Sequence, residues 1–209
     1  MDDAAAWASA GATTLAVVVA LFGPGFERWR RRPKLVLSDP PPELGTAAKV
    51  VGGPTDGDGV VHWLRVAVSN DGRSTAEDVR VILLRIDAPE PLRKQPPSRE
   101  LKWADVRTDR GSLPPRVARL VDVVHVKFVP DGGQLRRGLV AGVQPVSSAD
   151  SGQPGSLLWR DLTAGTYVVH VSVSARDVAA RHYAISFAVP AAGHPEAVAE
   201  ALRGAGVTT

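Results

Sequence analysis

Residues 60–89, VVHWLRVAVSNDGRSTAEDVRVILLRIDAP, are the stretch of sequence that decides the fold. Apolar residues alternate with polar or small ones over residues 64–68, and the alternation resumes over residues 79–83. A period of two is typical of a strand with one buried face. Between the two runs, Asn70 and Gly72 belong to a segment of residue types that favour tight turns. We therefore predict two antiparallel strands, joined by a hairpin at the Asn70 and Gly72 corner.

Similar patterns recur along the rest of the chain. Residues 165–175 alternate valine with polar residues after a Gly-Thr-Tyr start, and residues 183–189 alternate again, which predicts a second antiparallel pair. Short apolar runs at 34–38, 101–103 and 139–143 and a long β-branched run at 116–129 add further strands, whereas the polar stretch 45–59 has the composition of a loop. The predicted fold class is mainly β, a single antiparallel β-sandwich of about seven or eight strands. It spans residues 34–190, and residues 191–209 form a short C-terminal helix and tail.

The first 33 residues have a different composition and predict a membrane anchor. Residues 4–26 contain no charged side chain, and these 23 residues would make a helix of about 35 Å, enough to cross a bilayer core of roughly 30 Å. Trp7 stands near one end of the run and Trp29 near the other, as expected at membrane interfaces. The run is followed by a cationic flank: Arg28, Arg30, Arg31, Arg32 and Lys34.

The charge order around this run predicts its orientation in the cell membrane. Asp2 and Asp3 precede the apolar residues and the cationic flank follows them, the reverse of a secretory signal peptide. The positive-inside rule therefore predicts a single-pass protein with its N-terminus outside and its domain in the cytoplasm. A soluble helix and a disguised signal peptide are the alternatives. The flank also suits contact with anionic lipid head groups, although a topology signal explains it equally well.

Several functional classes find no support in the composition or the motifs. The chain has no cysteine, which excludes disulfides, thiolate catalysis and cysteine-ligated metals. It has no HExxH, phosphate-loop, GxGxxG or nucleophile-elbow motif in a fitting context. The 25 Lys and Arg barely exceed the 22 Asp and Glu, and aromatic residues make up only 5%. We therefore expect no enzyme activity, no cofactor, no metal and no nucleic-acid partner.

Two sequence patterns resemble a known group of domains. They are LxVxVxNxG at residues 64–72, followed by Ala76 and VxV at 79–81, and GTYxVxV at 165–171. Together they resemble bacterial immunoglobulin-like sandwiches of the CARDB (cell adhesion related domain found in bacteria) and fibronectin-III-like kind. The resemblance implies that the Asn-x-Gly corner closes a hairpin and that the small residue faces the core. It also implies a non-enzymatic role in adhering, spacing or scaffolding. We therefore expect a protein partner for the domain, and the lipid bilayer as the partner of the predicted anchor.

Histidines and tryptophans supply the remaining candidate site residues. His170 and His182 fall on the two strands of the second pair, and parity places His170 on the solvent face. A metal or acid-base role is one interpretation of this pair, and an ordinary polar strand face is the other. The alternative function is binding or hydrolysis of a small ligand or carbohydrate by Trp63, Trp103 or Trp159 together with Asp105 and His125. Trp63 and Trp159 suit a core equally well, and Trp103 suits a core or rim position better than a binding face.

Overall fold

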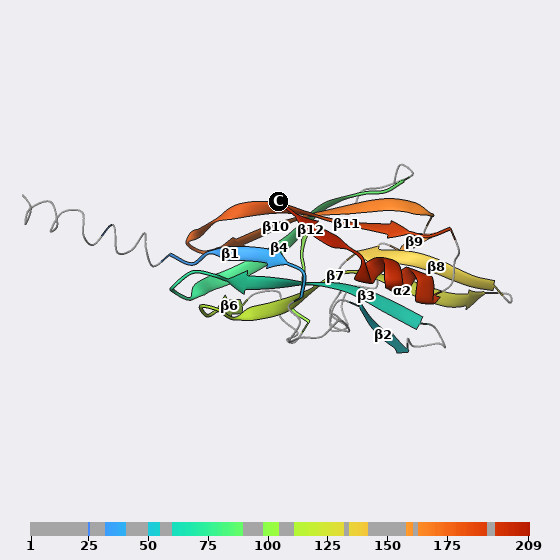
Figure 1. Cartoon of the computed structure of the whole chain (residues 1–209), viewed down its shortest axis with the longest axis horizontal. Coiled ribbons are helices and arrows are strands. Elements are labelled where there is room, and N and C mark those ends of the chain that lie inside the picture. The colour runs from blue at the N-terminus through green and yellow to red at the C-terminus, as the bar shows by residue number, and fades with distance from the viewer. Residues whose placement is uncertain are drawn as a thin grey trace, which may run out of the picture.

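Two antiparallel β-sheets packed face to face make up most of the described chain (Figure 1). This computed structural model describes residues 25, 32–40, 50–54, 60–89, 98–104, 111–131, 134–141, 158–160, 163–191 and 195–209. Within those ranges, seven strands have five residues or more and five have two to four residues. The predicted mainly β, two-sheet architecture is confirmed.

The first sheet has the strand order β1-β3-β7-β8-β9, with β2 beside β3. At one edge of this sheet, β1 (Leu35–Ser38) and β2 (Val50–Pro54) both pair with β3 (Val60–Asn70). The sheet continues from β3 through β7 (Ala118–Asp131) and β8 (Gln134–Ala141) to β9 (Leu158–Arg160). The strand β2 falls in the stretch predicted as a loop, because Gly52-Gly53-Pro54 has poor strand propensity and hides the pattern. Backbone pairing with β3 compensates for that propensity.

The second sheet has the order β12-β11-β10-β4-β5, with β6 beside β4. Its strands are β4 (Ala76–Asp87), β5 (Arg99–Glu100), β6 (Gly111–Leu113), β10 (Gly165–Ala175), β11 (Val178–Val189) and β12 (Gly206–Thr208). β10 and β11 form a hairpin whose register runs from Gly165↔Val189 to Ala175↔Val178. This hairpin confirms the second predicted pair.

The predicted hairpin between β3 and β4 is wrong, because the two strands lie in different sheets. β3 is paired on one edge with β1 and β2 and on the other with β7, so no edge remains for β4. Instead, β4 pairs with β10. The Asn70 and Gly72 corner is therefore an arch that carries the chain from one sheet to the other.

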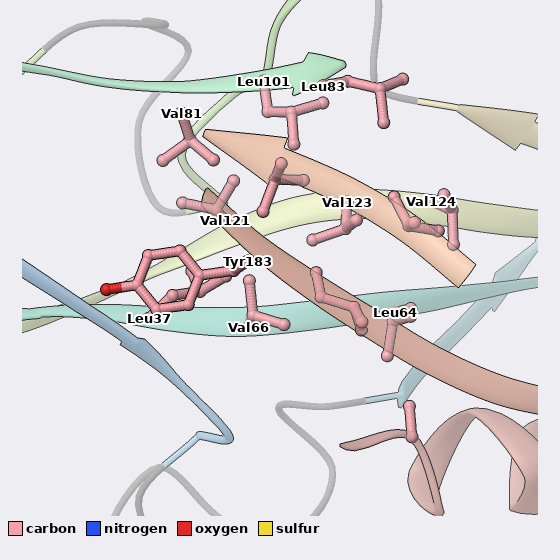
Figure 2. Close-up of a cluster of buried hydrophobic side chains, with 14 of the residues drawn as sticks. Leu37, Leu64, Val66, Val81, Leu83, Leu101, Val121, Val123, Val124 and Tyr183 are labelled. Carbon is pink, nitrogen blue, oxygen red and sulfur yellow. The ribbon is translucent and has the colours of Figure 1, made fainter. Parts of the chain in front are cut away.

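The core fills the space between the two sheets (Figure 2). Alternate residues of each long strand point inward, and each large apolar side chain buried in this way contributes about 1.5–3 kcal/mol. Buried residues of the first sheet and of the second meet in one cluster, together with Leu101 of the segment after β5. The labelled side chains show Leu37, Leu64, Val66, Val121, Val123 and Val124 of the first sheet with Val81, Leu83 and Tyr183 of the second.

Residues 98–104 cross from the second sheet to the first and close one side of the sandwich. Glu100 pairs with β4, and the Leu101 amide donates to Val81 O at 2.7 Å. Three residues later, the Ala104 amide donates to Leu120 O at 2.8 Å on β7. Between these contacts, Trp103 forms a bridge with β7 and is only 3% exposed. The tryptophan is thus part of the core.

The opposite side is covered by α2 (Pro195–Arg203), which packs against β3 and β11. Its buried residues Val198, Ala199 and Leu202 lie on one helical face. Pro195 begins the helix, and the Gly204 amide ends it by donating to Glu200 O at 2.9 Å. The predicted C-terminal helix is confirmed, and β12, which follows it, pairs with β11.

The predicted membrane anchor, residues 4–26, lies outside the described residues except for Gly25. Trp7, Arg28, Trp29, Arg30 and Arg31 lie outside them as well. Among the residues that are described, no helix combines the length and the apolar character needed to cross a membrane.

Candidate functional site

The Asn70 and Gly72 corner is a junction of separate chain segments. Asn70 is fully buried, and its Oδ1 accepts hydrogen bonds from the amides of Lys34 (3.1 Å) and Gly72 (3.0 Å). Its Nδ2 donates to the carbonyl oxygens of Ser74 and Leu113, both at 2.8 Å. Two donors and two acceptor positions of one amide are therefore satisfied, which a buried polar side chain requires.

This corner holds the backbone of residues 32–34, the last part of the cationic flank. The Lys34 amide donates a hydrogen bond to Asn70, and the Lys34 carbonyl oxygen accepts one from the Asp71 amide at 2.8 Å. A Cβ at position 72 would lie 2.5 Å from Arg32 O and 2.6 Å from Lys34 N. Gly72 is thus needed for this close approach of two backbones. The corner, predicted as a simple turn, joins the N-terminal segment to the domain.

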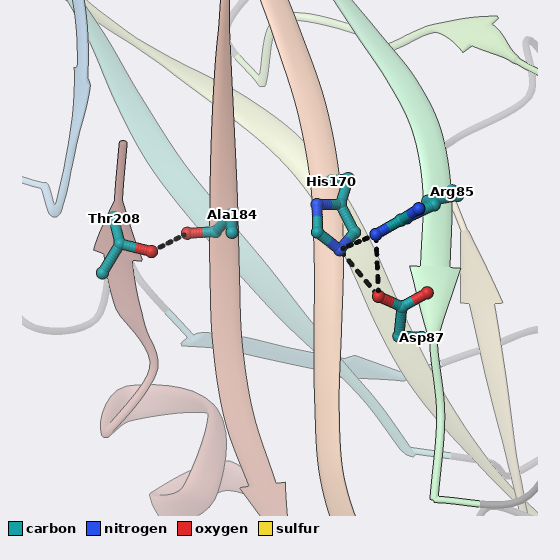
Figure 3. A network of polar contacts seen from close by, with 5 residues as sticks. All are labelled: Arg85, Asp87, His170, Ala184 and Thr208. Atoms are coloured by element: carbon teal, nitrogen blue, oxygen red, sulfur yellow. Dashed lines mark hydrogen bonds and ion pairs between the residues drawn. The ribbon is translucent and has the colours of Figure 1, made fainter.

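On the outer face of the second sheet, a β-bulge places two charged residues side by side (Figure 3). The register between β4 and β10 shifts at this point, which leaves Leu84 as the extra residue. As a result, Leu83 and Ile86 are both buried, whereas Arg85 and Asp87 are exposed. Strict alternation from Leu83 would have turned Arg85 and Asp87 toward the core.

Arg85, Asp87 and His170 form a polar cluster at the bulge (Figure 3). His170 Nε2 lies 2.8 Å from Asp87 Oδ2, and Arg85 Nη2 lies 3.4 Å from each of those two atoms. Half of the Asp87 side chain is exposed, and 60% of the Arg85 side chain. Ion pairs exposed to this degree contribute at most about 1 kcal/mol to stability.

His170 and His182 line one shallow hollow of about 360 Å³ beside this cluster. The two histidines lie on neighbouring strands, and His170 points away from the core, as predicted. Within the described ranges, no group of three carboxylate or imidazole side chains lies close enough to hold a metal ion. The open hollow also leaves the His170–Asp87 pair in contact with water. An acid-base catalyst gains little rate advantage where water is not excluded. The arrangement suits recognition of a polar surface.

The outer face of the first sheet brings together two residues of the predicted ligand site. Trp63 and His125 are directly opposite in the register of β3 and β7, and their ring centroids are 4.2 Å apart. Trp103 does not join them, because the crossing segment buries it in the core. Asp105 and the side chain of Trp159 lie outside the described part of the structure. Of the residues proposed for this site, the structure therefore brings Trp63 and His125 together and places Trp103 in the core.

A partly buried ion pair lies on the same face. Arg65 Nε is 2.6 Å from Asp122 Oδ1, and the two side chains are 20% and 11% exposed. Burial raises the pKa of Asp122, while the hydrogen bond and the charge of Arg65 act in the opposite direction. The pair satisfies two charges beside Trp63 and His125, and its long-range pairing is not visible in the sequence.

His62 is a partly buried titratable group on β3, and both of its ring nitrogens are shielded from solvent. Its ring packs edge-on against Phe128, with centroids 5.7 Å apart, and no described group hydrogen-bonds to either ring nitrogen. Burial lowers the pKa of His62, and the positive charge of Arg203 on α2 lowers it further. The ring is therefore accommodated in its neutral form.

We expect this histidine to make the fold sensitive to mild acid. Below its ordinary pKa of 6.5, His62 binds a proton more readily in the unfolded chain than in the folded one. Its contribution is therefore complete above pH 6.5 and is lost as the pH falls. The variant His62→Phe should show a smaller loss of unfolding free energy between pH 7.5 and pH 5.5, measured by urea titration. His182→Phe, on the exposed face, is the matched control and should behave like the parent; equal pH dependence in all three proteins contradicts the assignment.

No known protein-family model, curated protein or solved structure matches this chain. The interpretation of its surfaces therefore depends on their geometry. Sequence reasoning missed Arg85, Asp87, Arg65 and Asp122 as paired residues. The doublet Leu83-Leu84, which breaks the alternation, is the signal that could have located the bulge.

Proposed function

We propose that this chain is a single-pass membrane protein whose β-sandwich binds or scaffolds a protein partner at the inner face of the cell membrane. The observation that carries the proposal is the attachment of residues 32–34 to the Asn70 and Gly72 corner. A domain fixed at the end of the cationic flank is well placed to act beside the bilayer. The uncharged run of residues 4–26 supplies the proposed anchor.

The short connection supports a role close to the bilayer. Seven residues lie between Phe26, the last of the apolar run, and Lys34, whose backbone is held by the domain. Even when fully extended, the eight steps from one Cα to the next span only about 28 Å. A partner bound to this domain would therefore be kept near the lipid surface.

The proposed immunoglobulin-like assignment gains support from Tyr167 near the start of β10. Its hydroxyl donates a hydrogen bond to Thr163 O at 3.1 Å, four residues upstream. A tyrosine bonded to the backbone shortly before it, at a strand start, is the arrangement known as a tyrosine corner in immunoglobulin-like sandwiches. Domains of this kind mostly mediate contacts, which fits the exposed, polar character of the Arg85–Asp87–His170 cluster.

The topology part of the proposal is tested with a reporter fused to the C-terminus of the full chain. A reporter that works only in the cytoplasm should be active, and one that works only outside should be silent. Exchanging Asp2 and Asp3 for lysine while replacing Arg30, Arg31 and Arg32 with serine should reduce or reverse this preference. An active external reporter on the unaltered chain contradicts the proposed orientation.

The partner part is tested by chemical cross-linking of the full chain in its native membranes. We expect a discrete adduct containing this chain and one other protein, retained after stringent washing. Recovery of the uncross-linked chain alone over a wide range of reagent concentrations contradicts a stable binding or scaffolding role.

A further inference from the structure

We propose that one end of the sandwich is a contact surface for anionic phospholipid. This corner end comprises residues 32–34 and the turns at 70–75, 114–117 and 176–177, and the inference rests on the membrane anchor proposed above. β3 ends at this end, while β1, β4 and β7 begin near it. In Figure 1 it is the end of the sandwich at which β1 begins, at the left of the view.

Hydrogen bonds bring these turns together around the corner. The Arg116 amide donates to Asn70 O at 2.7 Å, and the Asn70 amide donates to Val117 O at 3.2 Å. The Arg176 amide donates to Glu77 O at 2.9 Å, which holds the β10–β11 turn beside the start of β4. The basic residues of three turns therefore share one end of the molecule with Lys34.

Exposed cations outnumber exposed carboxylates on this end. The corner end and the residues beside it carry five exposed basic residues and three exposed acidic ones. No described residue forms an ion pair with any of the five basic residues. The basic residues are Arg32, Lys34, Arg73, Arg116 and Arg176, and the acidic ones are Asp71, Glu77 and Asp177. Unpaired basic side chains are available to phosphate groups, which they bind through charge-assisted hydrogen bonds.

An apolar side chain projects from the same end. Val117 is 38% exposed, and among the described residues no other large hydrophobic side chain is exposed to this degree. It lies next to Arg116, whose φ of +60° is the left-handed conformation that glycine or asparagine adopts more easily. The turn thus presents a long cationic side chain and an apolar one together, despite backbone strain. Cationic groups flanking an apolar tip suit the head-group boundary of a bilayer.

The position of the corner end beside the proposed anchor favours an anionic bilayer as the surface that it contacts. Residues 32–34 are the last part of the cationic flank, so this end is the one nearest the proposed anchor. The cytoplasmic leaflet carries negative surface charge, and each basic residue near it favours contact by about fivefold. The domain would therefore rest on the lipid surface through Arg73, Arg116, Val117 and Arg176.

The test uses the full chain with a fluorescent label on a single introduced cysteine, since the chain has none of its own. Val117→Cys places the label at the corner end, and Ala164→Cys places it on an exposed residue before β10, at the other end of the sandwich. Each protein is reconstituted into phosphatidylcholine vesicles with or without phosphatidylserine, and with a quencher attached to the lipid head groups. Quenching at position 117 should rise in phosphatidylserine and fall in high salt, while position 164 should change little.

A variant with Arg73→Gln, Arg116→Gly and Arg176→Gln completes the design. We expect it to lower the ratio of lipid-bound to free domain by about 100-fold, so that the response to phosphatidylserine disappears. Its stability should be retained, because glycine relieves the strained φ at position 116. Equal quenching at position 117 in both vesicle types, or an unchanged response in the variant, overturns the proposal. Protection of position 117 by soluble polyglutamate but not by lipid also overturns it, and assigns this end to an acidic protein.

Flotation distinguishes this failure from failure of the anchor. A chain anchored by residues 4–26 should float with pure phosphatidylcholine vesicles in high salt, whatever happens at position 117. Flotation without lipid-dependent quenching overturns the contact surface alone. Flotation that needs phosphatidylserine and low salt supports the contact surface and contradicts the anchor.

Discussion

Replacing Asn70 with alanine is expected to lower the free energy of unfolding by about 4 kcal/mol, the largest effect of any single polar substitution in the described chain. The change leaves the amides of Lys34 and Gly72 and the carbonyl groups of Ser74 and Leu113 without their partner. A fully buried group costs about 1–3 kcal/mol when it is left unsatisfied, as the Leu113 carbonyl oxygen would be, and the three part-buried groups cost less each. Urea unfolding of the full chain in detergent micelles, followed by tryptophan fluorescence, measures the loss.

Ser69→Ala is the matched control for this prediction. Ser69 neighbours Asn70, but its hydroxyl donates only to the exposed carboxylate of Asp71, at 3.1 Å. Its removal should change the unfolding free energy by less than about 0.5 kcal/mol. A loss below about 1 kcal/mol for Asn70→Ala would contradict the role of the corner as a structural junction.

Trp103→Ala is expected to destabilise the fold by a similar amount, about 3–5 kcal/mol. Trp103 is almost fully buried and belongs to the segment that joins the two sheets. Its truncation leaves a cavity between β4 and β7 that the short crossing segment cannot close. Thermal unfolding monitored by circular dichroism measures this effect.

Trp103→Phe separates packing from hydrogen bonding at the same position. No described group accepts a hydrogen bond from the Trp103 Nε1, so phenylalanine removes a buried donor that lacks a partner there. It should cost less than about 1.5 kcal/mol, because a large aromatic ring is retained. A phenylalanine variant as unstable as the alanine variant would show that the indole nitrogen has an essential partner.

The long strands could be predicted because their pattern is local. Alternation over residues 64–68, 165–175 and 183–189 reflects one buried face, which each strand retains whichever strand it pairs with. The helix α2 was likewise predictable from Pro195, Gly204 and the apolar residues between them. Local sequence patterns were therefore enough to predict these strands and the helix.

Pairing between strands could not be predicted in the same way. The turn residues after Asn70 signal a change of direction, but they do not distinguish a hairpin from an arch between sheets. That choice depends on β1, β2 and β7, which occupy both edges of β3. Long-range contacts decided the topology here.

The candidate sites show the same division between local and long-range information. Parity correctly placed His170 on the solvent face, because one strand suffices for that prediction. Its contacts with Asp87 and Arg85 depend on a register shift that involves Leu84 on another strand. The sequence favours a core or rim position for Trp103 over a binding face, and the crossing segment, which pairs with β7, explains why the residue is buried.

The central claim, that residues 4–26 hold this chain in a membrane, is tested most directly by extraction. Membranes from cells that produce the full chain are washed with alkaline carbonate and separated by centrifugation. We predict that the chain stays in the pellet, and that Leu15→Arg combined with Val18→Arg releases it, because each central arginine costs about 2.5–3.5 kcal/mol of insertion. Recovery of the unaltered chain in the supernatant would contradict the account.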